Sequence, residues 1–96
     1  MLHIITYDLK DATLYEPLCA KLNEMGDAYP CTQSTFFLHT SRSAGGVDSE
    51  IRQLVDGKAN FAVIDITGIG EDRYFGRIPA REEGDRLWNW LKTNNA

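Results

Sequence analysis

The 96-residue chain has 43% hydrophobic and 25% charged residues, a composition typical of one globular domain, which we place at 1–96. Its net charge is −4, with five basic against nine acidic residues up to Thr67 and five of each after it. This balance disfavours nucleic-acid binding over a broad surface, because phosphate neutralisation needs clustered lysine and arginine. No apolar run reaches the roughly eighteen residues of a membrane span and no leader peptide is evident, so we expect a cytoplasmic protein without a membrane partner.

The first predicted element is a strand over residues 2–8. Both of its alternating faces are largely apolar, which suits a position in the middle of a sheet, and the strand ends on the carboxylate of Asp8.

A helix should follow this strand. Thr13-x-x-Glu16 has the form of a capping box, and apolar residues recur at helical spacing until Gly26, a residue suited to a helix end. Pro17 lacks the N–H that a helix interior uses, so we expect regular helix to begin near Glu16.

Three more strands and a second helix complete the predicted core. The strands are expected at 28–32, 34–40 and 60–67, with a bend near Gln33 between the first two. A loop over 41–46 should lead into a helix marked by Val47, Ile51, Leu54 and Val55 and ended by Asp56-Gly57.

This order of elements predicts a ferredoxin-like βαββαβ sandwich, an α+β fold with a core at 2–67. The extension at 68–96 is expected to add a strand at 73–78 and a helix at 82–92. Cys19 and Cys31 have neither metal-ligand spacing nor a disulfide framework, and both are predicted to be buried, reduced thiols.

Three short motifs occur in an order found in a known family: Ile5-Thr6-Tyr7-Asp8, Met25-Gly26 and Gln33-Ser34-Thr35-Phe36. The chain resembles the small CRISPR-associated endoribonuclease, the minor subunit of the spacer-acquisition complex, and more closely its stand-alone SinR-like relatives. The resemblance implies a homodimer that offers Asp8 to a divalent metal at the dimer cleft, with Ser34 as a neighbour. Two departures from the family are the acidic charge and the longer tail.

The predicted topology gives Asp8 a set of polar neighbours. The end of the first strand should meet the starts of the third and fourth strands, which bring Gln33, Ser34, Lys58 and Asn60 close to Asp8. Such a set could hold a hydrated Mg²⁺ or Mn²⁺ and activate water for phosphodiester cleavage, with Ser34 assisting. The alternative interpretation is structural: Asp8 begins the turn after the strand and caps it.

An alternative metal site is predicted at the other end of the sheet. His3, His39 and Asp65 all have odd numbers in their strands and are expected on one face of the sheet, where they could hold Zn²⁺ or Mn²⁺. The same face should carry a set of apolar residues that the helices leave open: Ile5, Tyr7, Phe37, Phe61 and Val63. A second protomer, or the C-terminal helix with Trp88 and Trp90, should cover that face.

The chain has one basic strip, in which Arg73, Arg77 and Arg81 are spaced by four and the aromatic residues Tyr74 and Phe75 lie between the first two. This strip could contact phosphates and bases of a single strand, or equally a protein partner, and the acidic net charge favours the protein interface. Arg42 and the loop at 41–46 could hold an anionic nucleotide at a helix N-terminus, or form only a flexible connection.

Two functions of different classes therefore remain. One is a homodimeric, Mg²⁺- or Mn²⁺-dependent endonuclease that uses Asp8. The other is a non-catalytic binding module, a regulator or phage-type accessory protein that holds a nucleotide, a nucleic acid or a protein partner.

Overall fold

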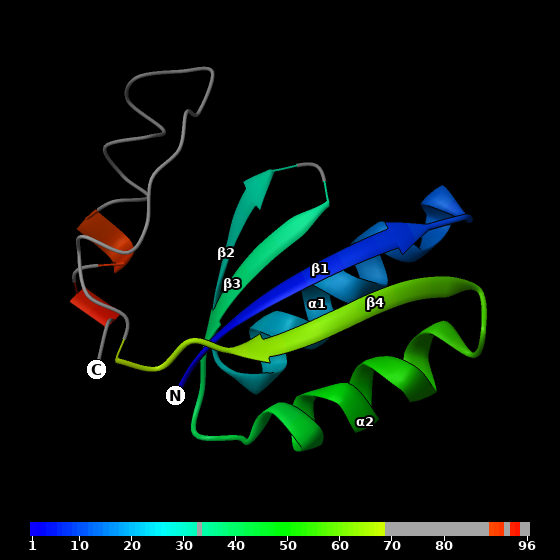
Figure 1. Ribbon diagram of the computed structural model, residues 1–96. Helices are drawn as coiled ribbons and strands as arrows, with labels where there is room; N and C mark the ends of the chain where they lie inside the picture. The colour runs from blue at the N-terminus through cyan, green and yellow to red at the C-terminus, as the bar shows by residue number, and fades with distance from the viewer. Residues whose placement is uncertain (33, 69–88, 92, 95–96) are drawn as a thin grey trace.

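The computed structural model of the protein describes residues 1–32, 34–68, 89–91 and 93–94 (Figure 1). Seven elements make up the continuous part: strands β1 (Leu2–Leu9), β2 (Asp27–Thr32), β3 (Thr35–His39) and β4 (Ala59–Asp65), the 3₁₀ turn η1 (Ala12–Leu14), and helices α1 (Tyr15–Met25) and α2 (Ala44–Val55). In the described residues no helix has the length and apolarity needed to cross a membrane.

The four strands form one sheet in the order β2-β3-β1-β4, with each neighbouring pair antiparallel. Helices α1 and α2 lie together on one face of this sheet (Figure 1). The predicted ferredoxin-like sandwich is confirmed, and β1 is a central strand with a neighbour on each side.

The main hydrophobic core lies between the sheet and the two helices. Ile5 is fully buried and stands opposite Phe36 on β3 and Val63 on β4, so the three strands contribute to one layer. The buried members of this core are Ile5, Tyr7, Leu18, Leu22, Met25, Phe36, Leu38, Val47, Ile51 and Val55.

The prediction of which strand residues face the helices was wrong for β1 and β4. Ile5 and Tyr7 belong to the core, and Phe61 and Val63 pack against it. Odd and even numbering does not carry across the sheet, because the register pairs Leu2 with His39 and therefore joins even positions of β1 to odd positions of β3. The open face consequently bears the even positions of β1 and β4 and the odd positions of β3.

The start of α1 differs from the predicted capping box. The cap of η1 is Asp11, whose carboxylate accepts from the backbone N–H of Thr13 at 3.0 Å. Regular helix begins at Tyr15, close to the expected Glu16. Pro17 then occupies the first turn, where its missing N–H leaves no intrahelical bond unmade.

Helix α2 begins earlier than predicted, so its first turn takes in Ala44 to Gly46 from the expected loop. Ser43 caps it by accepting from the N–H of Gly46 at 3.1 Å. The helix ends at Asp56, which adopts a left-handed backbone with φ 44°, and Gly57 follows with φ 79°.

Gly26 ends α1 for a steric reason. Its φ of 171° is extended, but a Cβ placed there would lie 2.2 Å from the backbone oxygen of His39. The close approach lets Thr40 donate its hydroxyl to the carbonyl of Met25 at 2.7 Å, which ties the end of α1 to the end of β3.

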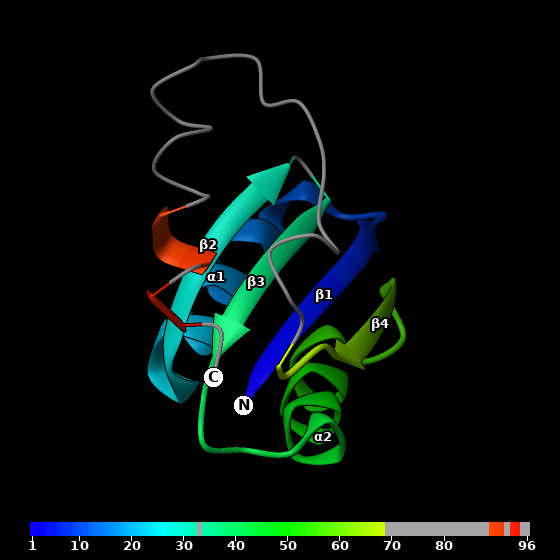
Figure 2. The same ribbon diagram turned by 60° about the vertical axis from the view of Figure 1, so that its left-hand side comes forward.

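A second, smaller hydrophobic cluster lies on the open face of the sheet. The helical residues 89–91 contribute to it and lie beside β2 (Figure 2). Leu91 is buried there against Leu2 and Phe37, and the Trp90 ring lies 5.6 Å from the Tyr29 ring, centroid to centroid. Trp90 also donates its indole N–H to Asp27 at 2.9 Å. The chain's own C-terminal residues are thus one cover of this face, as predicted for Trp90; Trp88 lies outside the described residues.

Candidate functional site

Asp8 lies near the end of β1 on the open face of the sheet. It stands directly opposite Asn60 of β4, and both side chains are exposed. The predicted proximity of Asp8 and Asn60 is confirmed. The Asp8 carboxylate has no hydrogen bond or ion pair within the part of the chain that the structure describes.

The structural role considered for Asp8 belongs to Asp11 instead. Asp11 accepts from the backbone N–H and from the hydroxyl of Thr13, the latter at 2.6 Å. These two hydrogen bonds hold the pKa of the Asp11 carboxyl below its ordinary value. Asp8 makes no such capping contact, so the turn after β1 does not account for a carboxylate at this position.

Two open hollows meet at Asp8. The larger, of about 500 Å³, is lined by Tyr7, Asp8, Leu9, Ala12, Tyr15 and Ser34. The smaller, of about 260 Å³, is lined by Thr6, Tyr7, Asp8, Asn60, Phe61 and Ala62. Asp8 therefore lies on the border between an aromatic hollow beside α1 and a shallower one over β4.

Ser34 is close to Asp8 but is not aligned with it. The N–H of Tyr7 donates to the carbonyl of Ser34 at 2.9 Å, one step beyond the registered pair of Thr6 and Thr35. Ser34 thus lies across from Tyr7, whose side chain faces the helices, and shares with Asp8 only the lining of the larger hollow. Gln33 lies outside the described residues. The charge of Lys58 helps to lower the pKa of Asp11.

Two phenols line the larger hollow in their protonated form. Burial, followed by the neighbouring Tyr15 and Cys19, raises the pKa of Tyr7 to about 12. A hydrogen bond with Cys19 and then burial raise the pKa of Tyr15. Both rings pack on Phe36, with centroid distances of 5.8 Å for Tyr7 and 6.2 Å for Tyr15. The hollow therefore has a rigid aromatic wall with neutral hydroxyls.

The donors at Asp8 suit a hard, hydrated cation. One carboxylate and one amide oxygen fit Mg²⁺, which keeps several waters and commonly uses one or two carboxylates together with substrate phosphates. Among the described residues no group of three or more His, Cys, Asp or Glu side chains could enclose a metal. A closed site of the kind that structural Zn²⁺ requires is thus absent from that part of the chain.

The alternative metal set of His3, His39 and Asp65 is contradicted by the strand register. His3 stands opposite Asp65, as predicted, but the pair lies on the helix side of the sheet and not on the open face where it was expected. His39 stands opposite Leu2 and so lies on the open face. Directly paired residues of antiparallel strands share a face, which means that the two imidazoles point away from each other.

His3 and Asp65 have structural partners. His3 is fully buried, and its Nε2 lies 2.8 Å from the carbonyl oxygen of Arg42, which requires that nitrogen to carry the proton. Asp65 accepts from the backbone N–H of Thr67 at 2.9 Å and from its hydroxyl at 2.5 Å. These bonds, followed by the charge of His3, lower the pKa of Asp65.

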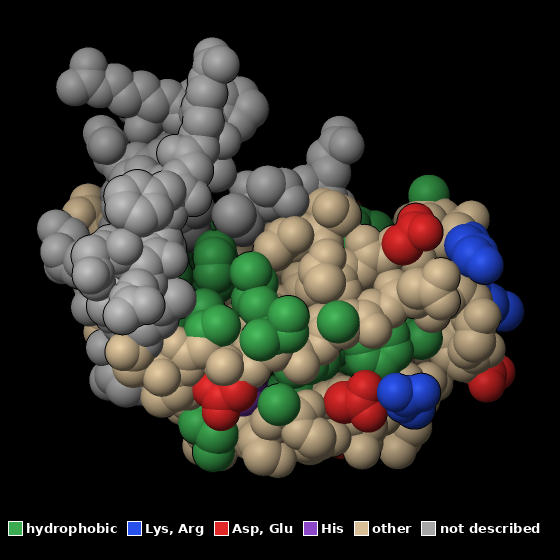
Figure 3. All heavy atoms as spheres, in the orientation of Figure 1, with side chains coloured by type: hydrophobic (Ala, Val, Ile, Leu, Met, Phe, Trp, Pro, Cys, Tyr) green, Lys and Arg blue, Asp and Glu red, His purple; other side chains and the backbone are tan. Residues whose placement is uncertain are grey.

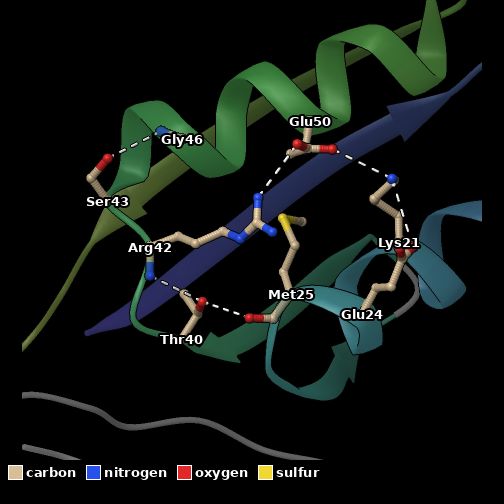
Figure 4. Close-up of polar contacts among 8 residues, drawn as sticks. All are labelled: Lys21, Glu24, Met25, Thr40, Arg42, Ser43, Gly46 and Glu50. Atoms are coloured by element: carbon tan, nitrogen blue, oxygen red, sulfur yellow. Dashed lines mark hydrogen bonds and ion pairs between the residues drawn. The ribbon is translucent and has the colours of Figure 1, made fainter.

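Of the predicted basic contacts, Arg42 is the one that the structure describes. Its guanidinium lies 3.4 Å from the carboxylate of Glu50, and its backbone N–H donates to the Thr40 hydroxyl (Figure 4). Arg42 therefore has an acidic partner in the middle of α2. Arg73, Tyr74, Arg77 and Arg81 lie outside the described residues.

No protein-family model and no curated protein matches this chain. A solved structure is similar to it: a hypothetical protein, TT1823, from Thermus thermophilus, with 23% sequence identity and a TM-score of 0.56. The match covers 82% of this chain and 96% of the Thermus chain. At this identity the likeness supports the fold alone, and the resemblance to CRISPR-associated nucleases stays a prediction from the sequence.

Tyr15 is the site residue that the sequence analysis missed. The helical spacing of apolar residues does not single it out, although it lies at the first residue of α1 and lines the hollow beside Asp8. Pro17 was the available signal, because a helix tolerates proline only in its first turn. The helix must therefore begin just before Pro17, which places Tyr15 next to the end of β1.

Proposed function

We propose that this protein is a homodimeric, metal-dependent nuclease in which Asp8 holds Mg²⁺ or Mn²⁺ at the end of β1. The observation that carries the proposal is the state of this carboxylate. It is exposed, has no partner among the described residues, and is not needed for the turn that Asp11 caps. A carboxylate without a structural task, between two hollows, is available for a ligand.

The chemistry would follow from the metal. A hydrated Mg²⁺ on Asp8 and Asn60 would polarise a phosphodiester and supply an activated water, and the substrate phosphate would complete its coordination. Ser34 lines the larger hollow and would contact the nucleic-acid substrate beside the metal; it would not be a metal ligand. Cys19 carries a free thiol, which suits a reducing compartment such as the cytoplasm.

A second protomer would complete the site. On the open face, the β1–β4 half exposes Thr6, Asp8, Asn60, Ala62 and Ile64, and Ile64 retains 51% of its accessible surface. Apolar side chains gather along this face of the sheet (Figure 3). Packing two such faces about a two-fold axis would bury Ile64 and bring a second Asp8 towards the first.

The second candidate is a binding module without catalysis. It is favoured by one observation: the described residues contain a single carboxylate at the site and no enclosed set of metal ligands. In that case the same hollows would hold a nucleotide, a nucleic acid or a protein segment.

The experiment compares wild type, Asp8→Asn and Asp65→Asn on single-stranded RNA and duplex DNA with Mg²⁺, Mn²⁺ or EDTA. Asp8→Asn removes a metal ligand at constant size, and a loss of at least about 100-fold in cleavage rate is expected. Asp65→Asn is the matched control, since that carboxylate lies at the other end of the sheet on Thr67. Equal cleavage by wild type and Asp8→Asn would contradict the proposal, and no cleavage by any of the proteins would favour the binding module.

A further inference from the structure

The larger hollow beside Asp8 has the features of a site for a flat ring. Its volume of about 500 Å³ lies within the range of clefts that hold small organic groups, and its wall is largely aromatic and aliphatic. We propose that this hollow is a base-binding subsite, which receives one unpaired nucleobase next to the phosphodiester held at Asp8. This inference rests on the proposed function, and it adds a positioning residue, Tyr15.

Tyr15 provides the stacking surface. Its ring is half-buried and packs on the Phe36 ring, with 6.2 Å between the centroids and a tilt of 34°. A ring already held by these contacts loses little freedom when a ligand stacks on it. Stacking on a nucleobase follows from the π-face alone, so the subsite needs no particular base.

The shape of the hollow selects an unpaired base. It lies at the end of the sheet, between the end of β1 and the start of α1, and its walls come from both elements. A base inside a duplex is stacked and paired on all sides and cannot enter, whereas bases of single strands, loops and ends can be turned outward. The border position of Asp8 then places the adjoining phosphate at the carboxylate that would hold the metal.

The test separates base recognition from catalysis. Binding is measured in EDTA, by fluorescence anisotropy, for a labelled oligothymidylate and for a strand of equal length in which every position is abasic. Wild type and Tyr15→Phe should bind the base-carrying strand more tightly by about 5- to 150-fold, the range expected for one stacked base. Tyr15→Leu should bind both strands equally.

A second variant avoids any loss of packing at Tyr15. Ala12 is exposed and lines the same hollow, so Ala12→Leu fills it while leaving Tyr15 and the core in place. This variant should also lose the preference for the base-carrying strand and keep the wild-type thermal unfolding profile. The proposal would be overturned if wild type bound both strands equally or bound neither. It would also be overturned if Tyr15→Leu and Ala12→Leu both kept the preference for the base-carrying strand.

The two proposals fail in different ways. Cleavage that depends on Asp8, combined with no preference for bases, would leave the nuclease in place and remove the subsite. A preference for bases that depends on Tyr15, with no cleavage under Mg²⁺ or Mn²⁺, would support the subsite on a protein that only binds.

Discussion

Asp8 and Asp11 are carboxylates on either side of the same turn, yet the structure uses them differently. Asp11 is occupied by the N–H and hydroxyl of Thr13, and its lowered pKa records those two bonds. The carboxylate of Asp8 is exposed opposite Asn60 and makes no hydrogen bond with any of the described residues. The contrast between two neighbours of the same type makes Asp8 the better candidate for a ligand.

Tyr7 gives a prediction for alkaline pH. Its pKa is about 12 in the folded protein and about 10 in an unfolded chain, so the unfolded chain loses this proton first. The stabilisation is complete below pH 10 and is lost as the pH rises towards 12. The free energy of unfolding of wild type, measured by urea unfolding, should therefore fall between pH 10 and pH 12 more steeply than that of Tyr7→Phe. Parallel pH dependences of the two proteins would contradict this, since the raised pKa of Tyr15 is common to both.

Side-chain alternation predicted the strands but not their faces. The odd positions and the even positions of β1 both begin with apolar residues. The two sets differ at the end of the strand, where Thr6 and Asp8 face outward and Tyr7 faces the core. The polar end was a usable signal. The pairing of even positions of β1 with odd positions of β3 had no such signal in the sequence. The register depends on pairing partners that lie far apart in the chain. This is the reason that His39 was wrongly grouped with His3.

At the level of elements, ion pairs connect α1, α2 and the segment after β3 (Figure 4). Glu50 of α2 lies 3.4 Å from Lys21 of α1 and 3.4 Å from Arg42. Its side chain is about one-third exposed, which limits the contribution of each pair to a fraction of a kcal/mol in water.

Glu50→Gln should consequently lower the free energy of unfolding by about 0.5–1 kcal/mol at low salt, because two partners lose their carboxylate at once. The loss should shrink in 0.5 M NaCl, where exposed pairs are screened. Glu24→Gln is the control, since Glu24 is 72% exposed and its one ion pair among the described residues is with Lys21 at 3.6 Å. Equal effects of the two substitutions in urea unfolding would show that the Glu50 pairs do not link the helices.

The boundaries of the elements were less predictable than their existence. The capping role fell to Asp11 rather than Thr13, and α2 took Ala44 to Gly46 from the expected loop once Ser43 could cap it. Each choice depends on which of several serine, threonine and aspartate side chains reaches an open N–H, and sequence spacing alone offers several solutions.

On the scale of the whole molecule, the open face of the sheet divides into two parts. Trp90 and Leu91 cover the part around Leu2 and Phe37, whereas Ile64 on β4 keeps 51% of its surface. The uncovered part is continuous with Asp8 and Asn60 through the alternation of β1 and β4. Apolar exposure and the candidate site therefore share one surface, which is why a second copy is the proposed partner.

Ile64→Asp should convert the proposed dimer to a monomer, because it places a charge in the middle of the buried contact. Sedimentation equilibrium of wild type and variant measures this directly. Gln53→Asp, at an exposed position of α2 on the other side of the sheet, introduces the same charge and should leave the dimer intact. A monomeric wild type, or a dimer unaffected by Ile64→Asp, would contradict this mode of assembly.

Metal binding at the end of β1 is the claim from which the proposed nuclease follows, and titration with Mn²⁺ followed by electron paramagnetic resonance tests it without relying on a substrate. Wild type and Asp65→Asn should both remove Mn²⁺ from solution, and Asp8→Asn should leave the free-ion signal as it is in buffer. Identical binding curves for wild type and Asp8→Asn, or no Mn²⁺ binding by wild type, would contradict it.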